Sequence, residues 1–240
     1  MLVQLFSGVI DLLYPPQCDL CGGALQAGER HVCAACVERL PVIRPPRCPV
    51  CCRPVRTRGG QDQLCGACRL HGRSVISRVA ALGEYREGLR ALIHAYKYRR
   101  HEFLSEPLGA WLARQGLALG ICSGADWLVP IPLHWTRERG RGFNQARRLA
   151  RRVSGVVDVP VLPRGDFIRA RRTTPQVQLS AASRAANIKG AFAVRRRERL
   201  AGARVVLVDD VLTTAATAAE CARTLRTAGA ADVRLLVLAR

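Results

Sequence analysis

The chain has 240 residues, of which 49% are hydrophobic and 23% are charged, a composition typical of a folded globular protein and not of a disordered segment. Its charge is one-sided: 38 basic residues against 18 acidic ones give a formal net charge of +20, and Lys97 and Lys189 are the only lysines. No stretch approaches the roughly 20 consecutive apolar residues of a membrane-spanning helix, so we expect no membrane span.

Residues 1–13 carry apolar side chains with a helical period. They lack the basic leader of a secretory signal and contain Asp11. We therefore expect an amphipathic helix that packs on a neighbouring domain, in a protein of the cytoplasm, where thiols stay reduced.

Eight of the 11 cysteines form four Cys-x2-Cys pairs. Eleven residues separate the first pair from the second, and 13 residues separate the third pair from the fourth. Each pair places two thiolates on one side of a tight turn, and two pairs complete the four ligands of a tetrahedral zinc ion at about 2.3 Å. Disulfides are the alternative, but a reducing compartment favours metal.

The ligands that we predict are Cys18, Cys21, Cys33 and Cys36 for one ion, and Cys48, Cys51, Cys65 and Cys68 for the other. Interleaved pairing would satisfy the same spacing, with longer loops. A closed site of four cysteines stabilises a fold and performs no chemistry. Residues 14–72 are therefore predicted to be a double zinc ribbon with two structural zinc ions, and Cys52, Cys122 and Cys221 to be buried spare residues.

Residues 74–240 have the pattern of an α/β domain. Helices are predicted over 88–98, 102–117, 143–153 and 214–228, and strands over 127–131, 157–162, 204–208 and 232–239. Strands that alternate with helices form a parallel sheet, and such a sheet binds ligands at the carboxyl ends of its strands.

Most of the net positive charge lies in the middle of this domain. Between residues 130 and 204, 17 arginines and one lysine accompany four acidic residues. This charge would attract phosphorylated sugars, pyrophosphate or nucleic acid. The candidate nucleic-acid contacts are Arg139, Arg141, Arg147, Arg151 and Arg172. The alternative is a solvated basic surface, and no motif for sequence-specific readout is present.

A continuous aliphatic run from residue 205 ends in Asp209 and Asp210 and leads into a turn that opens a helix. The turn supplies hydroxyl groups from Thr213, Thr214 and Thr217. A helix start binds phosphate through its N–H groups and dipole. Two carboxylates would repel phosphate, so we expect them to accept hydrogen bonds from sugar hydroxyls, directly or through Mg²⁺. A phosphorylated ribose would occupy both the phosphate-binding turn and the acid pair. The alternatives are a chance threonine cap after an acidic strand end or the metal site of a phosphatase.

This loop resembles the phosphoribosyl-pyrophosphate (PRPP) signature of type I phosphoribosyltransferases. The string Arg141-Gly142-Phe143-Asn144-Gln145 and the cysteine-rich segment ahead of the domain resemble the ComF (competence protein F) family, and the resemblance covers nearly the whole chain. It implies a type I phosphoribosyltransferase-like fold behind a zinc ribbon, PRPP with Mg²⁺ as ligand, and a link to DNA uptake and the handling of single-stranded DNA. Proteins of the competence machinery would be partners.

The resemblance also implies residue roles. Asp209 and Asp210 would bind the ribose hydroxyls, and the loop of residues 130–134, with Pro132 and His134, would lie near the pyrophosphate. The 5-phosphate would be held by Thr213, Thr214, Ala215, Ala216 and Thr217. A lid or strand-binding groove would include Arg171, Arg172, Gln176 and Arg184, with Arg171 and Arg184 on the leaving group. The family's loop reads Thr-Thr-Gly. If Ala215 has a positive φ, alanine costs about 1 kcal/mol there, whereas in a helical conformation it costs nothing.

Two kinds of function fit these features. The first is an enzyme that transfers the ribosyl phosphate of PRPP to a nitrogen nucleophile and stabilises the leaving pyrophosphate with arginine and Mg²⁺, which includes nucleobase salvage. The second is a nucleic-acid-binding module that uses the transferase fold as a scaffold without catalysis. The loop favours the first and the basic segment favours the second.

Overall fold

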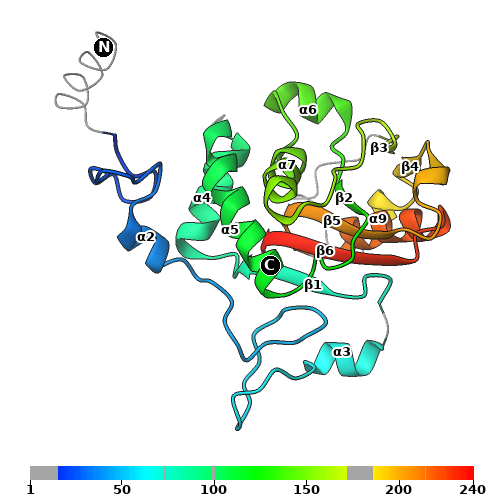
Figure 1. Ribbon diagram of the computed structural model, residues 1–240, viewed down its shortest axis with the longest axis horizontal. Coiled ribbons are helices and arrows are strands. Elements are labelled where there is room, and N and C mark those ends of the chain that lie inside the picture. Colours follow the sequence, from blue (N-terminus) through cyan, green and yellow to red (C-terminus); the bar gives the residue numbers. More distant parts are fainter. Residues whose placement is uncertain (1–15, 73, 99–100, 172–185, 214) are drawn as a thin grey trace.

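The computed structural model describes residues 16–240 apart from residues 73, 99–100, 172–185 and 214. At its centre is a four-stranded parallel sheet with the strand order β1-β6-β5-β2 (Figure 1). The strands are β1 (Val79–Gly83), β2 (Trp127–Pro130), β5 (Arg204–Val211) and β6 (Asp232–Ala239). The two inner strands are nearly continuous aliphatic runs, as expected for parallel strands that are covered on both faces.

Helices cover one face of the sheet: α4 (Glu87–Tyr98), α5 (Ser105–Ala118) with the short 3-10 turn η1 (Glu102–Leu104) ahead of it, and α7 (Gln145–Val157). The opposite face is covered by α9 (Ala216–Thr227) and by a small antiparallel pair, β3 (Phe167–Arg169) and β4 (Phe192–Val194). Two connections carry α6 (Trp135–Arg141) and the 3-10 turn η3 (Arg197–Arg199). None of the described helices is long and apolar enough to cross a membrane.

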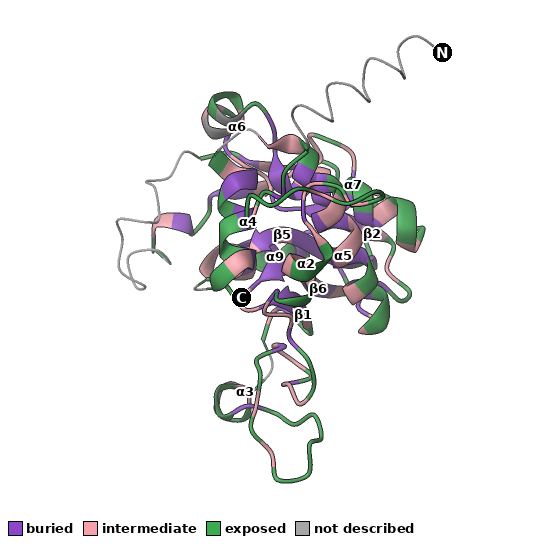
Figure 2. Ribbon diagram, turned by 90° about the vertical axis from the view of Figure 1, so that its left-hand side faces the viewer, coloured by how far each residue is buried: buried purple, intermediate pink, exposed green. Residues whose placement is uncertain are grey.

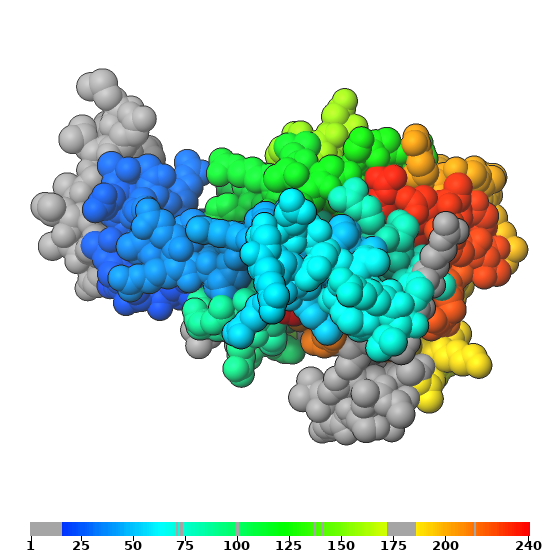
Figure 3. All heavy atoms as spheres, turned by 90° about the horizontal axis from the view of Figure 1, so that it is seen from below, coloured from blue at the N-terminus to red at the C-terminus, as the bar shows by residue number. Residues whose placement is uncertain are grey.

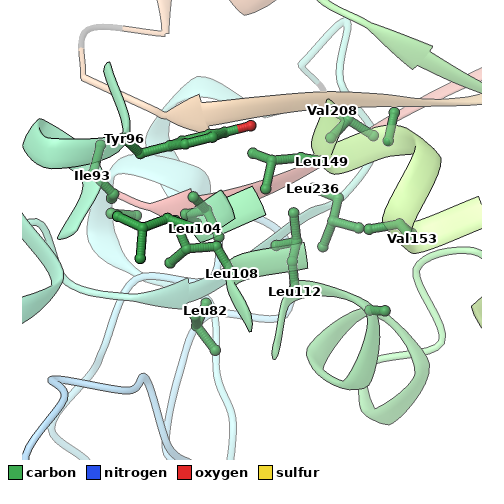
Figure 4. Packing of buried hydrophobic residues seen from close by; sticks show 14 of the residues in the cluster. Leu82, Ile93, Tyr96, Leu104, Leu108, Leu112, Leu149, Val153, Val208 and Leu236 are labelled. Carbon is green, nitrogen blue, oxygen red and sulfur yellow. The ribbon is translucent and has the colours of Figure 1, made fainter. Parts of the chain in front are cut away.

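Side-chain alternation along β5 divides the core into two clusters. Val206 and Val208 pack against α4, α5 and α7, where Leu108 and Leu149 are fully buried (Figure 4). Val205 and Leu207 point to the other face and pack against α9. Because this alternation continues along the strand, consecutive residues at the end of β5 are directed to opposite faces of the sheet.

The cysteine-rich segment lies along the β1 edge of the sheet and includes the short helices α2 (Ala34–Glu38) and α3 (Gly66–His71) (Figures 1 and 3). The N–H of Ile43 donates to the carbonyl of Leu82 at 2.9 Å, and Val42 pairs with Gly83. A Cβ on Gly83 would lie 2.6 Å from the carbonyl oxygen of Pro41, so only glycine permits this close approach. The segment is largely exposed around α3 (Figure 2). Ile43, by contrast, is buried in the domain's core.

The parallel sheet and the helices on its faces confirm the predicted fold class. The strand predicted over residues 157–162 is wrong, because α7 continues to Val157. Asp158 then ends the helix with a φ of 52° and donates its N–H to the carbonyl of Ser154. Only Val161 in this stretch pairs with the sheet, through a parallel bridge to Leu128.

Candidate functional site

Two clusters of four cysteines lie in the N-terminal segment. Within each cluster, the four sulfur atoms lie within 4.8 Å of one another. One cluster contains Cys18, Cys21, Cys33 and Cys36, and the other contains Cys48, Cys51, Cys65 and Cys68. The predicted sequential pairing is therefore confirmed over the interleaved one.

The geometry of both clusters fits zinc. Four sulfurs at about 2.3 Å from a tetrahedral ion lie about 3.8 Å apart. The sulfurs of Cys21 and Cys33 are 3.8 Å apart, and those of Cys51 and Cys65 are 3.6 Å apart. Burial acts to raise the pKa of Cys18, but backbone N–H groups outweigh it and lower the pKa to about 6. Burial and the neighbouring thiols raise the pKa of Cys36 in the same cluster. The spacing of the four sulfur atoms is therefore the observation that supports a structural zinc ion in each cluster.

The remaining cysteines are placed as predicted. Cys52, Cys122 and Cys221 are buried. The thiol of Cys52 faces the carbonyl oxygen of Ala81 in β1 at 3.9 Å, on the core side of the neighbouring ligand Cys51. These residues pack as small apolar side chains.

A cavity of about 820 Å³ opens at the carboxyl ends of the strands. Its walls come from α4, the loop after β2, the start of α7 and the turn between β5 and α9. This is the edge at which a parallel sheet commonly binds ligands. The polar and charged lining includes Lys97, Arg169, Asp209, Asp210 and Thr217.

Asp209 and Asp210 lie at this edge, near the end of β5 and just before the turn that leads into α9. Asp210 is buried and faces the side of the sheet that α4 covers, whereas Asp209 is half-buried and faces the α9 side. The N–H of Asp210 donates to Oδ1 of Asp209 at 2.9 Å. Both carboxylates line the cavity, so they can accept hydrogen bonds from a ligand's hydroxyl groups or coordinate a hard cation.

Lys97 is a charged residue of this cavity that the sequence did not reveal. It lies in the last turn of α4, and its Nζ is 2.8 Å from Oδ1 of Asp210. Only 18% of the lysine side chain and 10% of the aspartate side chain are exposed. Burial acts to lower the pKa of Lys97, but the charge of Asp210, its hydrogen bond and the charge of Asp209 outweigh burial and raise it. The lysine is therefore a fixed cation within the cavity.

The turn after β5 has the conformation of a helix start. Thr213, Ala215 and Thr217 line the cavity, and α9 begins at Ala216. Ala215 occupies the N-cap position with φ 60° and ψ −8°, a left-handed conformation. The first N–H groups of a helix suit an oxyanion, and a residue without a branched side chain leaves them accessible. The backbone at position 215 thus has the left-handed conformation that favours glycine, the residue of the family's loop, although this chain has alanine there.

Glycine at position 215 should stabilise the protein by roughly 0.5–1 kcal/mol, because release of left-handed strain outweighs the greater chain entropy of glycine. Urea unfolding of Ala215→Gly measures this effect. The matched control is Ala216→Gly, one residue further on inside α9, which should lose up to about 1 kcal/mol. A loss of stability in Ala215→Gly would contradict the left-handed conformation.

The string of residues 141–145 shapes the opposite wall of the cavity. Asn144 caps α7, because its Oδ1 accepts the N–H of Arg147 at 3.1 Å. Its Nδ2 donates to the carbonyl of Ile131 at 3.3 Å. The hydroxyl of Tyr96 donates to the carbonyl of Gln145 at 3.0 Å. The string therefore ties α7 both to the loop after β2 and to α4.

The two predicted residues of the loop after β2 have different roles in the structure. Pro132 lines the cavity. His134 is buried, and its Nδ1 accepts the N–H of Thr136 at 3.4 Å and lies 2.9 Å from the hydroxyl of that residue. The histidine thereby caps α6, a short helix that the sequence did not predict.

Of the predicted lid, the structure describes Arg171. Its guanidinium donates to the carbonyls of Asn187 and Lys189 at 3.0 and 2.7 Å, so it holds together the two ends of the segment between β3 and β4. Arg169, two residues earlier, is buried in the cavity wall 5.6 Å from the ring centre of Phe192. Thr214, Arg172, Gln176, Arg184 and the side chain of Arg141 lie outside the described residues.

The other candidate nucleic-acid contacts differ in exposure. Arg139 and Arg151 are exposed. Arg147 is half-buried and donates to the carbonyl of Leu162. Its neighbour Arg148, which was not among the candidates, pairs with Glu102. The first two are available to a polyanion, whereas the other two fasten α7 to its neighbours.

Sequence comparisons agree with this two-part organisation. The sequence pattern of the double zinc ribbon domain matches residues 9–69, and that of the phosphoribosyl transferase domain matches residues 139–240. The second match includes the loop between β5 and α9 and both acidic residues ahead of it.

The chain is similar along most of its length to curated bacterial proteins, three of which illustrate the match. It is 29% identical to competence protein F of Haemophilus influenzae over 93% of this chain and 96% of that protein. It is 31% and 32% identical to the DNA utilization protein YhgH of Salmonella typhi and of Escherichia coli K12, in each case over 95% of this chain and 99% of the relative. The chain therefore belongs to the competence protein F (ComF) family, with a double zinc ribbon ahead of a phosphoribosyltransferase domain.

Proposed function

We propose that the protein binds PRPP with Mg²⁺ in the cavity at the carboxyl edge of its sheet and acts as a phosphoribosyltransferase. The observation that carries this proposal is one cavity that contains an acid pair, a helix start and the loop after β2. These groups match the three parts of the ligand: ribose hydroxyls, 5-phosphate and pyrophosphate.

In this proposal Asp209 and Asp210 bind the ribose, and the turn from Thr213 to Thr217 holds the 5-phosphate. Pro132 lies beside the pyrophosphate, and Arg169 and Arg171 add positive charge near it. The carboxylate oxygens are ligands that suit Mg²⁺, which would neutralise charge on the leaving pyrophosphate. The protein's own contribution is then to position the sugar and stabilise charge.

The test is a thermal shift with PRPP and Mg²⁺. At a hundredfold excess over its dissociation constant, the ligand should contribute about 2.7 kcal/mol, which raises the melting temperature by roughly 5–10 °C in a chain of this size. The double variant Asp209→Asn/Asp210→Asn should lose the shift, whereas Asp158→Asn, at the exposed end of α7, should keep it. An equal shift in the double variant would refute the assignment.

We also propose that single-stranded nucleic acid binds the basic surface of the domain. Two observations support this: the relatives carry the names competence protein F and DNA utilization protein, and the 130–204 region combines 17 arginines with few acids. Exposed Arg139 and Arg151 would contact phosphates. A non-catalytic role for the transferase fold is the second candidate, in which PRPP is a ligand without turnover. Release of pyrophosphate from PRPP with candidate bases separates the two.

Binding to a single-stranded oligonucleotide should weaken steeply as the salt concentration rises. Arg139→Ala/Arg151→Ala should reduce the slope of log affinity against log salt by about 1–2, since each phosphate contact contributes roughly 0.7 for a single strand. Arg58→Ala is the control, because Arg58 is an exposed arginine of the zinc ribbon. No binding at low salt would rule out the nucleic-acid role.

A further inference from the structure

One cation of the cavity has no part in the function proposed above. Lys97 reaches the acid pair from α4, and its Nζ lies 2.8 Å from Oδ1 of Asp210. The pleat of β5 turns Asp210 to the side of the sheet that α4 covers, so the contact follows from the fold and not from a flexible surface pair. With 18% and 10% of the two side chains exposed, the pair is largely removed from solvent.

Because the pair is buried, the contact determines which cation balances the charge of Asp210. An ionised carboxylate in a poorly solvated site needs a compensating charge, and a divalent ion is the usual partner of an acid pair that faces a phosphorylated ligand. Here a side chain supplies that charge. An ammonium group has three N–H donors, so Nζ can hold Asp210 and also donate to an oxygen of a bound sugar.

Mg²⁺ and Lys97 would compete for the same oxygen. Mg²⁺ requires ligand oxygens at about 2.0–2.1 Å, so an ion on Oδ1 of Asp210 would bring a second cation close to the ammonium group that this oxygen already binds, and the two positive charges would repel each other. A metal on Oδ1 of Asp210 would have to displace the lysine and leave it buried without its partner, which is costly.

We propose that Lys97 is the resident cation of the acid pair, so that the sugar half of the site binds a pentose 5-phosphate without Mg²⁺. Lys97 holds the carboxylate of Asp210 and orients it toward the vicinal hydroxyls, and the metal is needed only for a pyrophosphate group. Lys97 is thus a positioning residue that sets the metal requirement. This inference rests on the proposed function, because it concerns the same cavity.

Titration calorimetry with ribose 5-phosphate tests the inference, because this ligand has the sugar and the phosphate but no pyrophosphate. The wild type should bind it equally well in EDTA and in excess Mg²⁺. Lys97→Met should bind about tenfold to a hundredfold more weakly in EDTA, the effect of losing a charged hydrogen bond, and Mg²⁺ should restore part of the loss. Lys189→Met, at the other, exposed lysine, should behave as the wild type.

The outcomes separate the two proposals. If the wild type needs Mg²⁺ for ribose 5-phosphate, or if Lys97→Met binds as tightly as the wild type in EDTA, the role of Lys97 is overturned while PRPP binding stands. If neither ribose 5-phosphate nor PRPP with Mg²⁺ binds, both proposals fall. Should Lys97→Met not fold, Lys97→Met/Asp210→Asn removes the two charges together. That variant should bind weakly in EDTA, and Mg²⁺ should not restore it, because Asp210 is then no longer a metal ligand; tight binding would again overturn the role.

Discussion

We expect Cys48→Ser to lower the zinc content of the purified protein from two ions to one and to unfold the segment around the second cluster. Cys48 is 1% exposed and is one of the four sulfurs gathered there. Binding of a structural zinc ion contributes about 10–16 kcal/mol in small zinc domains, which is as large as the whole folding free energy of a typical domain. Because Ile43 and Cys52 bury themselves against the sheet, the loss should also lower the melting temperature of the domain.

Metal analysis with a thermal melt measures both effects. The matched control is Cys52→Ala, since Cys52 is a buried cysteine next to a ligand but outside both clusters. It should keep two zinc ions and lose only packing, about 1–2 kcal/mol. Two zinc ions in Cys48→Ser, or cysteines joined in disulfides in the wild type, would contradict a pair of structural metal sites.

The fold was predictable where the local pattern is strong. The Cys-x2-Cys spacing predicted both clusters, and the aliphatic runs of β5 and β6 predicted the centre of the sheet. The short strands were not predicted. Strand β1 has the sequence Val-Ala-Ala-Leu-Gly, which lacks a β-branched run, and β3 and β4 have three residues each. Their pairing depends on partners far along the chain, which no local pattern encodes.

The predicted strand at residues 157–162 failed for a related reason. The hydrophobic pattern of this stretch favours a strand, but the apolar face of α7 continues through Val153 to Val157 against the core. Tertiary packing decided the conformation, and the left-handed Asp158 set the end of the helix.

The candidate site was predictable only in its contiguous part. Asp209, Asp210 and the turn after them are one local motif, and the structure brings them to one cavity. Lys97 and Arg169 enter the cavity from α4 and β3, so they depend on the topology of the sheet. The scarcity of lysine in an arginine-rich chain was the one signal that could have singled out Lys97.

Lys97→Met is expected to lower the free energy of unfolding by about 3–5 kcal/mol at neutral pH, because it leaves the carboxylate of Asp210 buried without its cation. The pKa of Lys97 is raised in the folded protein. The stabilisation is therefore fully present below the ordinary lysine pKa of 10.5 and is lost only as the pH rises through the raised value. Urea unfolding at pH 7 measures the loss.

The double variant Lys97→Met/Asp210→Asn distinguishes a lost ion pair from a lost packing contact. Removing both charges takes away the pair and also the unpaired carboxylate, so the double variant should be clearly more stable than Lys97→Met alone. A methionine stem fills much of the space of the lysine stem, which keeps the packing of α4 against the sheet nearly constant. If Lys97→Met lies within about 0.5 kcal/mol of the wild type, as surface substitutions usually do, the pair does not hold the end of β5 to α4.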